Sequence, residues 1–239
     1  MKRRAFINVL GGAIACPLTE ISADTPSTGA DPPEPMAAER IAMTEAAHAF
    51  MVQYDVPGLS VAIGHLGRLL YQDAFGWADR EAGEAATPTH LFRVCSISKP
   101  VTSVAIFTLV EQGRLRLGDK VFGQGAVLGT DYRQSYRPSY PPGVDEITIE
   151  HLLTHTSGGW PNDGYDPMFH SKRSNHAELI ASAMYEWLKN PPGEVFAYSN
   201  FGYCVLGRVI EKVAGKPYAD FVHESVLGRC GVSSAASAG

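Results

Sequence analysis

The sequence predicts a mixed α/β protein of the α+β type, with helices packed on an antiparallel sheet. Two observations predict this fold class: two strand-like segments are joined by a tight turn, and helical segments precede and follow them. The chain of 239 residues is 45% hydrophobic and 19% charged, which is the composition of a globular protein with one good core. One folded domain is therefore expected.

The first helix is expected over residues 36–54, where small and apolar residues recur at intervals of three and four. Ile41, His48 and Val52 lie on the face that this pattern turns inward. A Val-Pro-Gly sequence at 56–58 ends the pattern, because proline cannot continue a helix and glycine favours a turn.

A β-hairpin is expected directly after this helix. Residues 59–63 and 68–77 have the apolar composition of strands, and His-Leu-Gly at 65–67 provides the turn between them. A lone hairpin is only marginally stable in water, so this one needs neighbouring strands to pair its edges.

The most apolar helix is expected at residues 101–110, between Pro100 and Gly113. Proline is tolerated in the first turn of a helix, so Pro100 places the helix start near Ser96. The residue before a proline is biased away from the helical region, which leaves the conformation of Lys99 open. Apolar residues lie on every side of the segment, and we expect the helix to be buried all round.

The rest of the chain is predicted to be largely helical. Residues 118–142 have no clear period and are expected to form a surface loop. A helix at 148–155, capped by its first residue, and a helix at 177–188 follow. Asn200 is expected to be the N-cap of the next helix, and Pro217 opens the last one.

Ser96 and Lys99 place a hydroxyl and an amine three positions apart at a helix start, so that both can face one point. A serine hydroxyl becomes a strong nucleophile when a base removes its proton, and lysine is such a base when desolvation lowers its pKa. The N–H groups at the helix start would stabilise the negative charge that develops. The same pattern fits a capping serine beside a solvated lysine, and Cys95 is an alternative nucleophile without a histidine partner nearby.

Three segments support the catalytic interpretation. They are Leu-Phe-Arg-Val-Cys-Ser-Ile-Ser-Lys at 91–99, Leu-Leu-Thr-His-Thr-Ser-Gly-Gly at 152–159 and Pro-Gly-Glu-Val-Phe-Ala-Tyr-Ser-Asn-Phe-Gly-Tyr at 192–203. Together they resemble the superfamily of serine β-lactamases and penicillin-binding proteins. The Tyr-x-Asn element resembles the branch that holds class C β-lactamases, D-alanyl-D-alanine carboxypeptidases and related esterases. The hairpin resembles the first strands of that fold, so the similarity extends over residues 36–227.

The resemblance implies a β-lactamase-like fold and a serine hydrolase that acts through an acyl-enzyme on Ser96. Its substrate would be a small-molecule or peptide acyl compound, namely an amide, an ester or a β-lactam, and no cofactor is implied. Lys99 would take or organise the proton of Ser96, while Tyr198 would pass a proton to the leaving group and activate the hydrolytic water. Asn200 would hydrogen-bond the substrate amide and Lys99.

The third element of this family, Lys or His followed by Thr or Ser and then Gly, does not occur after Asn200. The strand that carries it normally supplies one of two backbone donors to the oxyanion, and losing one such donor lowers the rate about 10²- to 10³-fold. The resemblance therefore implies an incomplete domain over residues 36–228, without its C-terminal strands, of doubtful activity and poor stability. Besides a hydrolase, a penicillin-binding or sensing module that acylates without turnover and an inactive fragment remain open.

Two further patterns suggest other chemistry. His151 and His155 lie four apart on one short helix, as two zinc ligands can, but no Glu follows His151 and no third ligand is evident. We expect no metal site there, and we expect His155 to shape a loop at the rim of the site. Cys95, Cys204 and Cys230 match no zinc or redox spacing, and buried free thiols are favoured over a single disulfide.

The N-terminus resembles a twin-arginine export signal. Arg3 and Arg4 precede a modestly apolar stretch, and small residues of the kind that signal peptidases recognise follow it. We expect a signal peptide at 1–23, a proline-rich flexible lead-in at 24–35 and a periplasmic or secreted protein. An amphipathic helix that stays attached is the alternative. A disordered tail is expected at 229–239.

Charge and composition argue against other classes of partner. The formal net charge is -5, and no run of Lys and Arg beyond the first four residues could follow a phosphate backbone, so no nucleic-acid partner is expected. The apolar stretch near the N-terminus is too short to span a bilayer, and no membrane span is expected. The sequence leaves the oligomeric state open.

Overall fold

The computed structural model describes residues 36–137, 139–170 and 175–233. Contacts divide the chain into two compact units, Met1–His90 and Leu91–Gly239. The predicted signal peptide and lead-in lie outside the described residues. Within the described part of the chain, no helix combines the length and the apolar character needed to cross a membrane.

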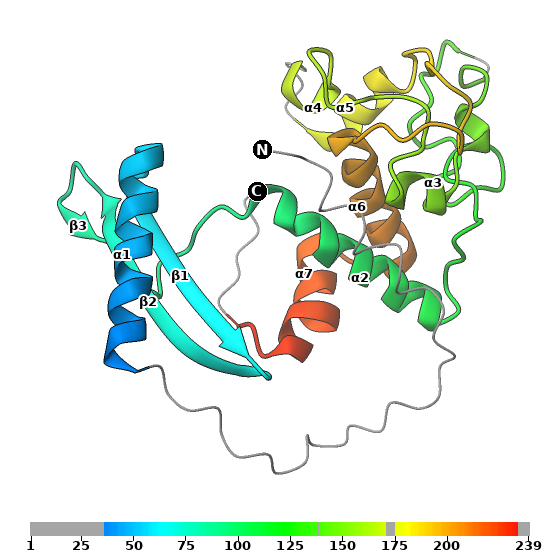
Figure 1. Ribbon diagram of the computed structural model, residues 1–239. Coiled ribbons are helices and arrows are strands. Elements are labelled where there is room, and N and C mark those ends of the chain that lie inside the picture. Colours follow the sequence, from blue (N-terminus) through cyan, green and yellow to red (C-terminus); the bar gives the residue numbers. More distant parts are fainter. Residues whose placement is uncertain (1–35, 138, 171–174, 234–239) are drawn as a thin grey trace. The chain divides into compact units, whose positions relative to one another are not determined.

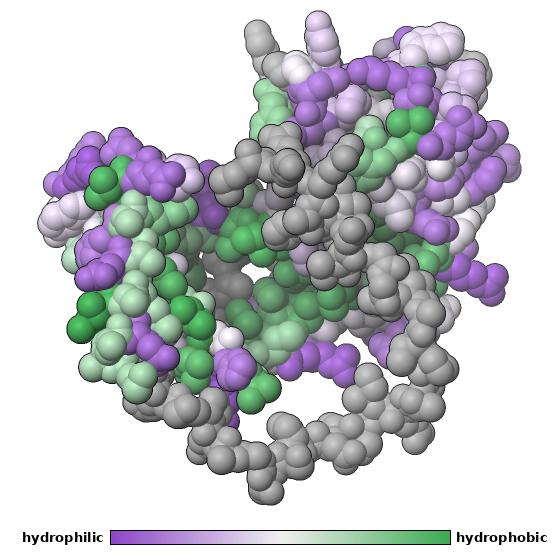
Figure 2. Space-filling model, in the orientation of Figure 1, coloured by the Kyte–Doolittle hydropathy of each residue, from purple (hydrophilic) through white to green (hydrophobic). Residues whose placement is uncertain are grey.

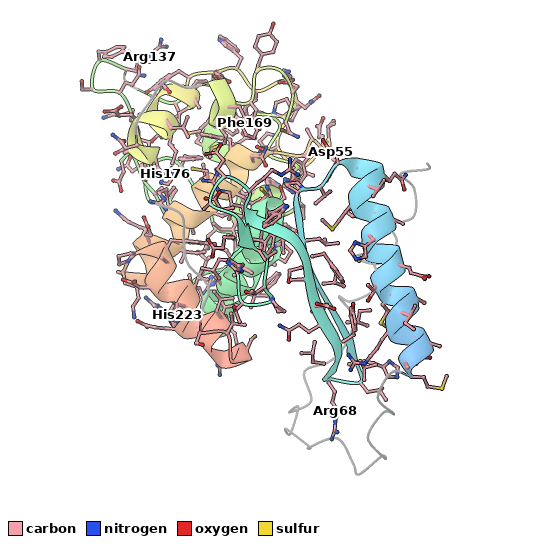
Figure 3. The ribbon with its side chains drawn as sticks, turned by 90° about the vertical axis from the view of Figure 1, so that its left-hand side faces the viewer. Asp55, Arg68, Arg137, Phe169, His176 and His223 are labelled. Carbon is pink, nitrogen blue, oxygen red and sulfur yellow. The ribbon has the colours of Figure 1, made fainter. Side chains whose placement is uncertain are left out.

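The first unit is a helix packed on an antiparallel hairpin (Figures 1 and 3). Helix α1 spans Ala37–Tyr54, strands β1 and β2 span Gly58–His65 and Arg68–Asp79, and the short strand β3 at Glu84–Ala85 pairs with the end of β2. Leu66 and Gly67 form the turn between β1 and β2 with φ of 49° and 76°, and a type I′ turn requires positive φ at both positions. The predicted hairpin is confirmed.

The face of α1 that packs on the hairpin differs from the predicted one. Ala47 is buried and Thr44 hydrogen-bonds a tyrosine hydroxyl of β2 at 3.3 Å, whereas Ile41 and Val52 are exposed. Of the predicted positions, His48 does reach the hairpin, with its ring centroid 5.0 Å from that of a phenylalanine on β2. Ala47 is the buried residue of α1 among those described, so the helix turns a small side chain inward in place of the larger residues that the pattern favours. Figure 2 shows apolar (green) side chains left on the surface of this unit.

The second unit holds the main hydrophobic core, which surrounds helix α6 (Figure 1). Its helices are α2 (Ser98–Glu111), α3 (Ile149–Leu153), α4 (Pro167–His170), α5 (His176–Ala183), α6 (Asn200–Ala214) and α7 (Tyr218–Val222). Helix α6 contacts α2, α3, α4 and α7, and its apolar face is fully buried at Val205, Leu206, Val209 and Ile210. Burial of this face fixes the position of the start of α6, where the candidate site residue Asn200 is the first helical residue and Tyr198 lies two positions before it.

Helical structure continues beyond α7. A π-helical turn at His223–Leu227 is followed by a 3-10 turn at Gly228–Cys230. Helical structure therefore reaches two residues into the segment that was predicted to be a disordered tail, and residues 234–239 lie outside the described residues.

Helix α2 is buried on one side rather than all round. Ile106 and Leu109 are fully buried, while Val104 and Phe107 are 50% and 51% exposed. The prediction of all-round burial is wrong for the described residues, because the neighbours of α2 in this unit, including α6 and α7, pack against one side of it.

The segment predicted as a surface loop, residues 118–142, is irregular but contributes to the core. Val121, Phe122 and Leu128 are buried, and the N–H of Leu128 donates to the carbonyl of Val121 at 2.9 Å. These core positions could not be predicted from the sequence, because no regular helix or strand sets their spacing. The prediction of a purely superficial loop is therefore corrected.

Two predicted helices end earlier in the structure. Helix α5, predicted over 177–188, ends at Ala183, where the indole N–H of buried Trp160 donates to the Ala183 carbonyl at 2.9 Å. A side chain thus satisfies a carbonyl that a longer helix would bond internally. Helix α3 begins after its cap Thr148, as predicted, and ends at Leu153.

Candidate active site

Ser96 lies at the sharp turn that starts helix α2. Cys95 has a φ of 44°, in the left-handed region that residues other than glycine seldom adopt, and the 3-10 turn Cys95–Ile97 runs directly into α2. Pro100 occupies the first turn, as predicted, and Lys99 is helical although it precedes the proline. Ser96 and Lys99 are therefore about one helical turn apart, and Ser96 is exposed to solvent.

The Lys99 ammonium group lies between the candidate nucleophile and helix α6. Its Nζ donates to Ser96 Oγ at 3.2 Å and to Asn200 Oδ1 at 2.8 Å. It also lies 4.7 Å from the ring centroid of Tyr198 and 5.6 Å from that of Tyr203. Because aromatic faces attract a cation, the two rings and the amide together hold Lys99 beside Ser96.

The Tyr198 hydroxyl is the second group on the nucleophile. It donates a hydrogen bond to Ser96 Oγ at 2.8 Å. Burial by itself would raise the pKa of the Tyr198 phenol, but interactions with Lys99 and Ser96 outweigh burial, and the pKa lies below the ordinary value of 10.0. A phenol with a lowered pKa reaches the phenolate form, which accepts protons, more readily.

The start of helix α6 presents Tyr198 and Asn200 to the site. Ser199, rather than the predicted Asn200, is the N-cap: its hydroxyl accepts the Gly202 N–H at 3.0 Å. The prediction failed because serine and asparagine cap about equally well. Asn200 is instead the first helical residue, and its side chain is engaged with the site.

The Asn200 amide makes three hydrogen bonds within the protein. Its Oδ1 accepts from Lys99, while its Nδ2 donates to Asn162 Oδ1 at 3.0 Å and to Asp166 Oδ2 at 2.8 Å. Asp166 is fully buried, and its other carboxylate oxygen accepts the Met168 N–H at 2.9 Å near the start of α4. An ammonium group cannot accept and a carboxylate cannot donate, so these partners fix which end of the amide faces Lys99.

His155 packs against the rings of Tyr198 and Tyr203, with centroid distances of 4.5 and 5.0 Å. Its Nδ1 accepts the Ser199 N–H at 3.1 Å. Burial, and then the positive charge of Lys99, lower the pKa of His155 to about 4. The imidazole is therefore neutral at neutral pH and carries its proton on Nε2. The sequence predicted a loop residue at the rim, whereas the structure places this ring against the site tyrosine.

Three members of this cluster were missed at the level of sequence: Asn162, Asp166 and Tyr203. Tyr203 had a signal, since it lies three positions after Asn200 on the same helix, where side chains share a face. Its hydroxyl donates to the Leu153 carbonyl at 3.1 Å, which links α6 to α3. No pattern in the sequence indicated Asn162 or Asp166, because the segment between α3 and α4 has no regular period.

His151 is part of a helix cap, and the three described cysteines form no disulfide. The Nδ1 of His151 accepts the Thr148 N–H at 3.3 Å as part of the α3 cap. Among the described residues, no group of three or more His, Cys, Asp or Glu side chains is arranged to hold a metal ion. Cys95, Cys204 and Cys230 are free thiols, as favoured. The expectation of burial is wrong for Cys95 and Cys230, which are exposed, and holds only in part for Cys204, which is partly buried and whose thiol pKa burial raises to about 11.

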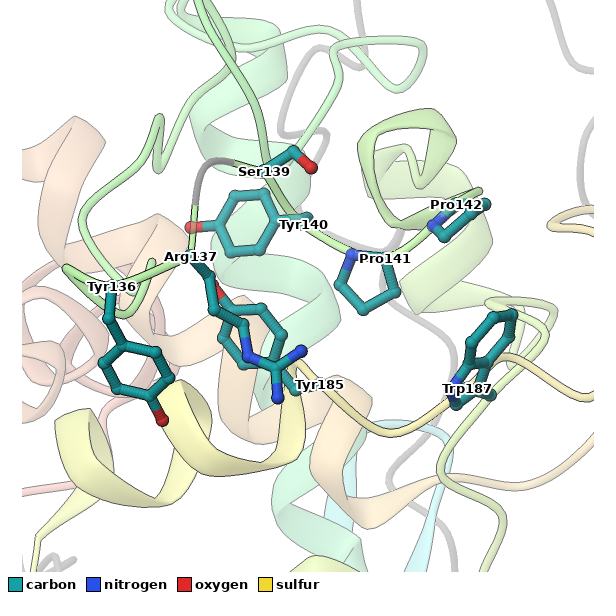
Figure 4. A pocket seen from close by; sticks show the side chains of 8 residues that line it. All are labelled: Tyr136, Arg137, Ser139, Tyr140, Pro141, Pro142, Tyr185 and Trp187. Carbon is teal, nitrogen blue, oxygen red and sulfur yellow. The ribbon is translucent and has the colours of Figure 1, made fainter.

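The second unit also contains a hollow of about 510 Å³ that is lined by other residues than the candidate site (Figure 4). Its lining combines aromatic, proline and polar side chains: Tyr136, Arg137, Ser139, Tyr140, Pro141, Pro142, Tyr185 and Trp187. The Arg137 guanidinium lies 4.5 Å from the ring centroid of Tyr185. The lining includes none of the four candidate site residues, so this hollow is not the cluster around Ser96.

A serine hydroxyl within hydrogen-bonding distance of both a lysine and a tyrosine is typical of enzymes that form an acyl-enzyme. Comparison with known proteins agrees with this class, since the family model described as Beta-lactamase matches residues 43–237. The chain belongs to this family, within the superfamily of serine β-lactamases and penicillin-binding proteins, as its sequence motifs indicated.

Individual relatives are similar over most of the chain. Penicillin-binding protein 4* of Bacillus subtilis (strain 168) is 33% identical over 168 residues, which are 67% of this chain and 34% of the relative. The octameric penicillin-binding protein homologue from Pyrococcus abyssi has a TM-score of 0.63 and 33% identity, and the match covers 80% of this chain and 43% of that one. EstCE1, a hydrolase with promiscuous acyltransferase activity, has a TM-score of 0.66 and 28% identity over 81% of this chain and 51% of its own. The chain spans about a third of the length of the curated relatives it matches.

Proposed function

We propose that this chain is a serine hydrolase that forms an acyl-enzyme on Ser96, with an amide, an ester or a β-lactam as substrate. The observation that carries the proposal is the convergence of three groups, since Ser96 Oγ lies 2.8 Å from the Tyr198 hydroxyl and 3.2 Å from Lys99 Nζ. A capping serine beside a solvated lysine would not need the lysine to bond Asn200 as well. The convergence of these groups therefore favours the catalytic interpretation.

Acylation begins with the proton of Ser96. In the resting arrangement both Tyr198 and Lys99 donate to Ser96 Oγ, so one of them must first give a proton to bulk water, which reaches the exposed Ser96, before it can act as the base. Tyr198 is the better candidate, because its pKa is lowered and the positive charge of Lys99 stabilises a phenolate. The phenolate accepts the Ser96 proton as Oγ attacks the acyl carbon, and that proton then passes to the leaving group as its bond to carbon breaks.

Hydrolysis of the acyl-enzyme repeats these steps with water. The Tyr198 phenolate accepts a proton from water as its oxygen attacks the acyl carbon, and the proton returns to Ser96 Oγ as the ester bond breaks. The hydrogen bond from Lys99 Nζ to Asn200 Oδ1 keeps the lysine side chain in place during both steps. The N–H groups at the start of α2 favour negative charge on the acyl oxygen.

The names of two relatives support acyl chemistry. EstCE1 is described as a hydrolase with promiscuous acyltransferase activity, and the Bacillus subtilis relative is described as a penicillin-binding protein. An ester substrate and a β-lactam substrate both form an acyl-enzyme, so the two descriptions are consistent with one mechanism on Ser96.

The proposal is tested by labelling the purified chain with a fluorescent fluorophosphonate and with a fluorescent penicillin, and by measuring hydrolysis of nitrocefin and of a p-nitrophenyl ester. Turnover supports the hydrolase, a stable penicillin label without turnover supports a binding or sensing module, and no label with either probe supports an inactive fragment. Ser96→Ala should abolish all signals. Ser98→Ala is the matched control, because it removes another hydroxyl at the start of the same helix and should leave the signals in place.

We also propose that the chain is exported to the periplasm or secreted through the twin-arginine route. The support is the Arg3-Arg4 pair followed by a modestly apolar stretch and small residues. Fractionation of cells that express the full chain tests this proposal.

A further inference from the structure

We propose that His155 is a positioning residue, which holds the Tyr198 hydroxyl on Ser96 Oγ through its imidazole nitrogen, its carbonyl and the face of its ring. The inference rests on the proposed function, because it assigns His155 a part in the reaction of Ser96. Tyr198 and Lys99 donate the hydrogen bonds that reach Ser96 Oγ, and His155 contacts the first of these two residues. The effect of His155 on the reaction therefore passes through Tyr198.

Two hydrogen bonds to His155 bracket Tyr198 along the chain. The Ala197 N–H donates to the His155 carbonyl at 2.8 Å, and the Ser199 N–H donates to His155 Nδ1 at 3.1 Å. The carbonyl of Tyr198 itself accepts the Asn162 N–H at 2.7 Å. The backbone is thus held at Tyr198 and at both of its neighbours, and His155 provides the contacts on either side.

The bond to Nδ1 is the one that depends on the histidine side chain. Ser199 is the N-cap of α6, so its N–H has no acceptor within the helix. Ser199 is also only 1% exposed, so water cannot readily replace a lost acceptor, and a buried N–H without an acceptor is costly. The imidazole nitrogen therefore keeps Ser199, and with it the preceding Tyr198, in the observed conformation.

The imidazole ring also packs against the phenol ring of Tyr198. Their centroids lie 4.5 Å apart, and their planes are inclined at 33°. The same imidazole contacts the ring of Tyr203 at 5.0 Å and that of Phe196 at 5.8 Å. Because aromatic neighbours hold the imidazole in turn, the phenol has little room to swing its hydroxyl away from Ser96 Oγ.

A neutral imidazole suits this role. Burial, and then the positive charge of Lys99, lower the pKa of His155 to about 4, so the ring is uncharged at neutral pH. With its proton on Nε2, a neutral imidazole leaves Nδ1 free to accept the Ser199 N–H. A protonated imidazole carries a proton on both nitrogens and could not accept this bond.

The kinetic test compares two replacements of His155 that both suit its φ of 60°. His155→Gly removes the ring and the acceptor, and His155→Asn places Oδ1 where Nδ1 was. Fluorophosphonate labelling of Ser96 should be about 10- to 100-fold slower in His155→Gly than in the parent, because a small displacement of the Tyr198 hydroxyl costs up to about 10²-fold in rate. His155→Asn should react about 2- to 10-fold faster than His155→Gly, since it regains one hydrogen bond.

Two features separate positioning from a general loss of stability. In hydrolysis of a p-nitrophenyl ester the loss should fall on kcat and leave KM unchanged, whereas partial unfolding would lower the amount of labelled protein rather than the rate constant. His151→Asn is the matched control, because His151 Nδ1 accepts the Thr148 N–H in the α3 cap, and its labelling rate should equal that of the parent.

Equal rate constants for the parent and His155→Gly, or for His155→Gly and His155→Asn, would overturn the inference. A second measurement does not depend on chemistry at Ser96: ¹⁵N NMR of ¹⁵N-histidine-labelled parent at neutral pH, assigned with His155→Asn, shows which imidazole nitrogen carries the proton. We expect it on Nε2, and a proton on Nδ1 would contradict the bond from Ser199. Failure of the probe to label Ser96 in the parent, with the proton on Nε2, would contradict the proposed function and leave the contact between His155 and Ser199 supported.

Discussion

Replacing His155 by asparagine should remove a pH-dependent part of the stability. The imidazole sits against two tyrosine rings, and Nδ1 accepts the Ser199 N–H. Asparagine is the matched replacement, because its Oδ1 takes the place of Nδ1 as acceptor and because it tolerates the φ of 60° at this position better than most residues. The variant cannot take up a proton at this position.

The direction in which the free energy of unfolding changes with pH follows from the two pKa values of His155. The pKa of His155 is about 4 in the folded chain, against an ordinary value of 6.5. Between these values the unfolded chain binds more protons, so the free energy of unfolding is highest above pH 6.5 and falls as the pH is lowered toward 4. Because the ring keeps some exposure to solvent, we expect a loss of roughly 1 to 2 kcal/mol from this group between about pH 7 and about pH 5.

The assay is urea unfolding, followed by circular dichroism, at about pH 7 and about pH 5 for the parent and His155→Asn. The parent should lose roughly 1 to 2 kcal/mol more than the variant on acidification, and contributions of other titrating groups cancel in this difference. His65→Asn is the control, because His65 ends β1 on the surface of the other unit. Equal losses for the parent and His155→Asn would refute the argument that a buried, neutral imidazole supports the site.

Three further predictions concern the helix cap, a tight turn and export. Ser199→Ala should lower the free energy of unfolding by about 0.5 to 2 kcal/mol, measured by urea unfolding, because α6 loses its N-cap. Gly158→Ala should prevent stable folding, seen as a lost cooperative thermal melt, because Gly158 has a φ of 83° and a Cβ there would overlap the Asn190 carbonyl oxygen. Arg3→Lys with Arg4→Lys should lower the exported fraction, measured by immunoblotting of cell fractions.

Each of these predictions has a control and an outcome that contradicts it. Ser199→Thr keeps a capping hydroxyl and should restore most of the stability, so equal losses for Ala and Thr would argue against the cap. Gly164→Ala has open space for its Cβ, and a Gly158→Ala melt as cooperative as that of Gly164→Ala would show that the turn relaxes. Unchanged export of the double lysine variant, with Lys2→Arg as the control, would refute the twin-arginine proposal.

The sequence predicted the parts of the fold that have a period or a strong turn signal. The hairpin was readable because Leu66-Gly67 suits a tight turn between two strand-like segments, and the start of α2 was readable because Pro100 is confined to a first turn. The rotation of α1 was not predictable, since the helix buries the small Ala47 while its larger residues Ile41 and Val52 are exposed. The core positions in the segment 118–142 were hidden for lack of any regular spacing.

The candidate site was predictable where sequence motifs carried it. Ser96, Lys99, Tyr198 and Asn200 were expected together, and the structure joins them by hydrogen bonds. The role of Asp166 could not be predicted from the sequence, because its contact with Asn200 spans 34 positions and depends on how the segment between α3 and α4 folds.

Acylation of Ser96 can be located by peptide mapping with mass spectrometry after treatment with a fluorophosphonate. We expect one adduct, on the peptide that contains Ser96, and no adduct in Ser96→Ala. Tyr198→Phe, which keeps the ring but removes the hydroxyl 2.8 Å from Ser96 Oγ, should slow adduct formation about 10²- to 10⁴-fold. An adduct on another residue, or one that forms equally fast in Tyr198→Phe, would show that Ser96 and Tyr198 do not act as nucleophile and base.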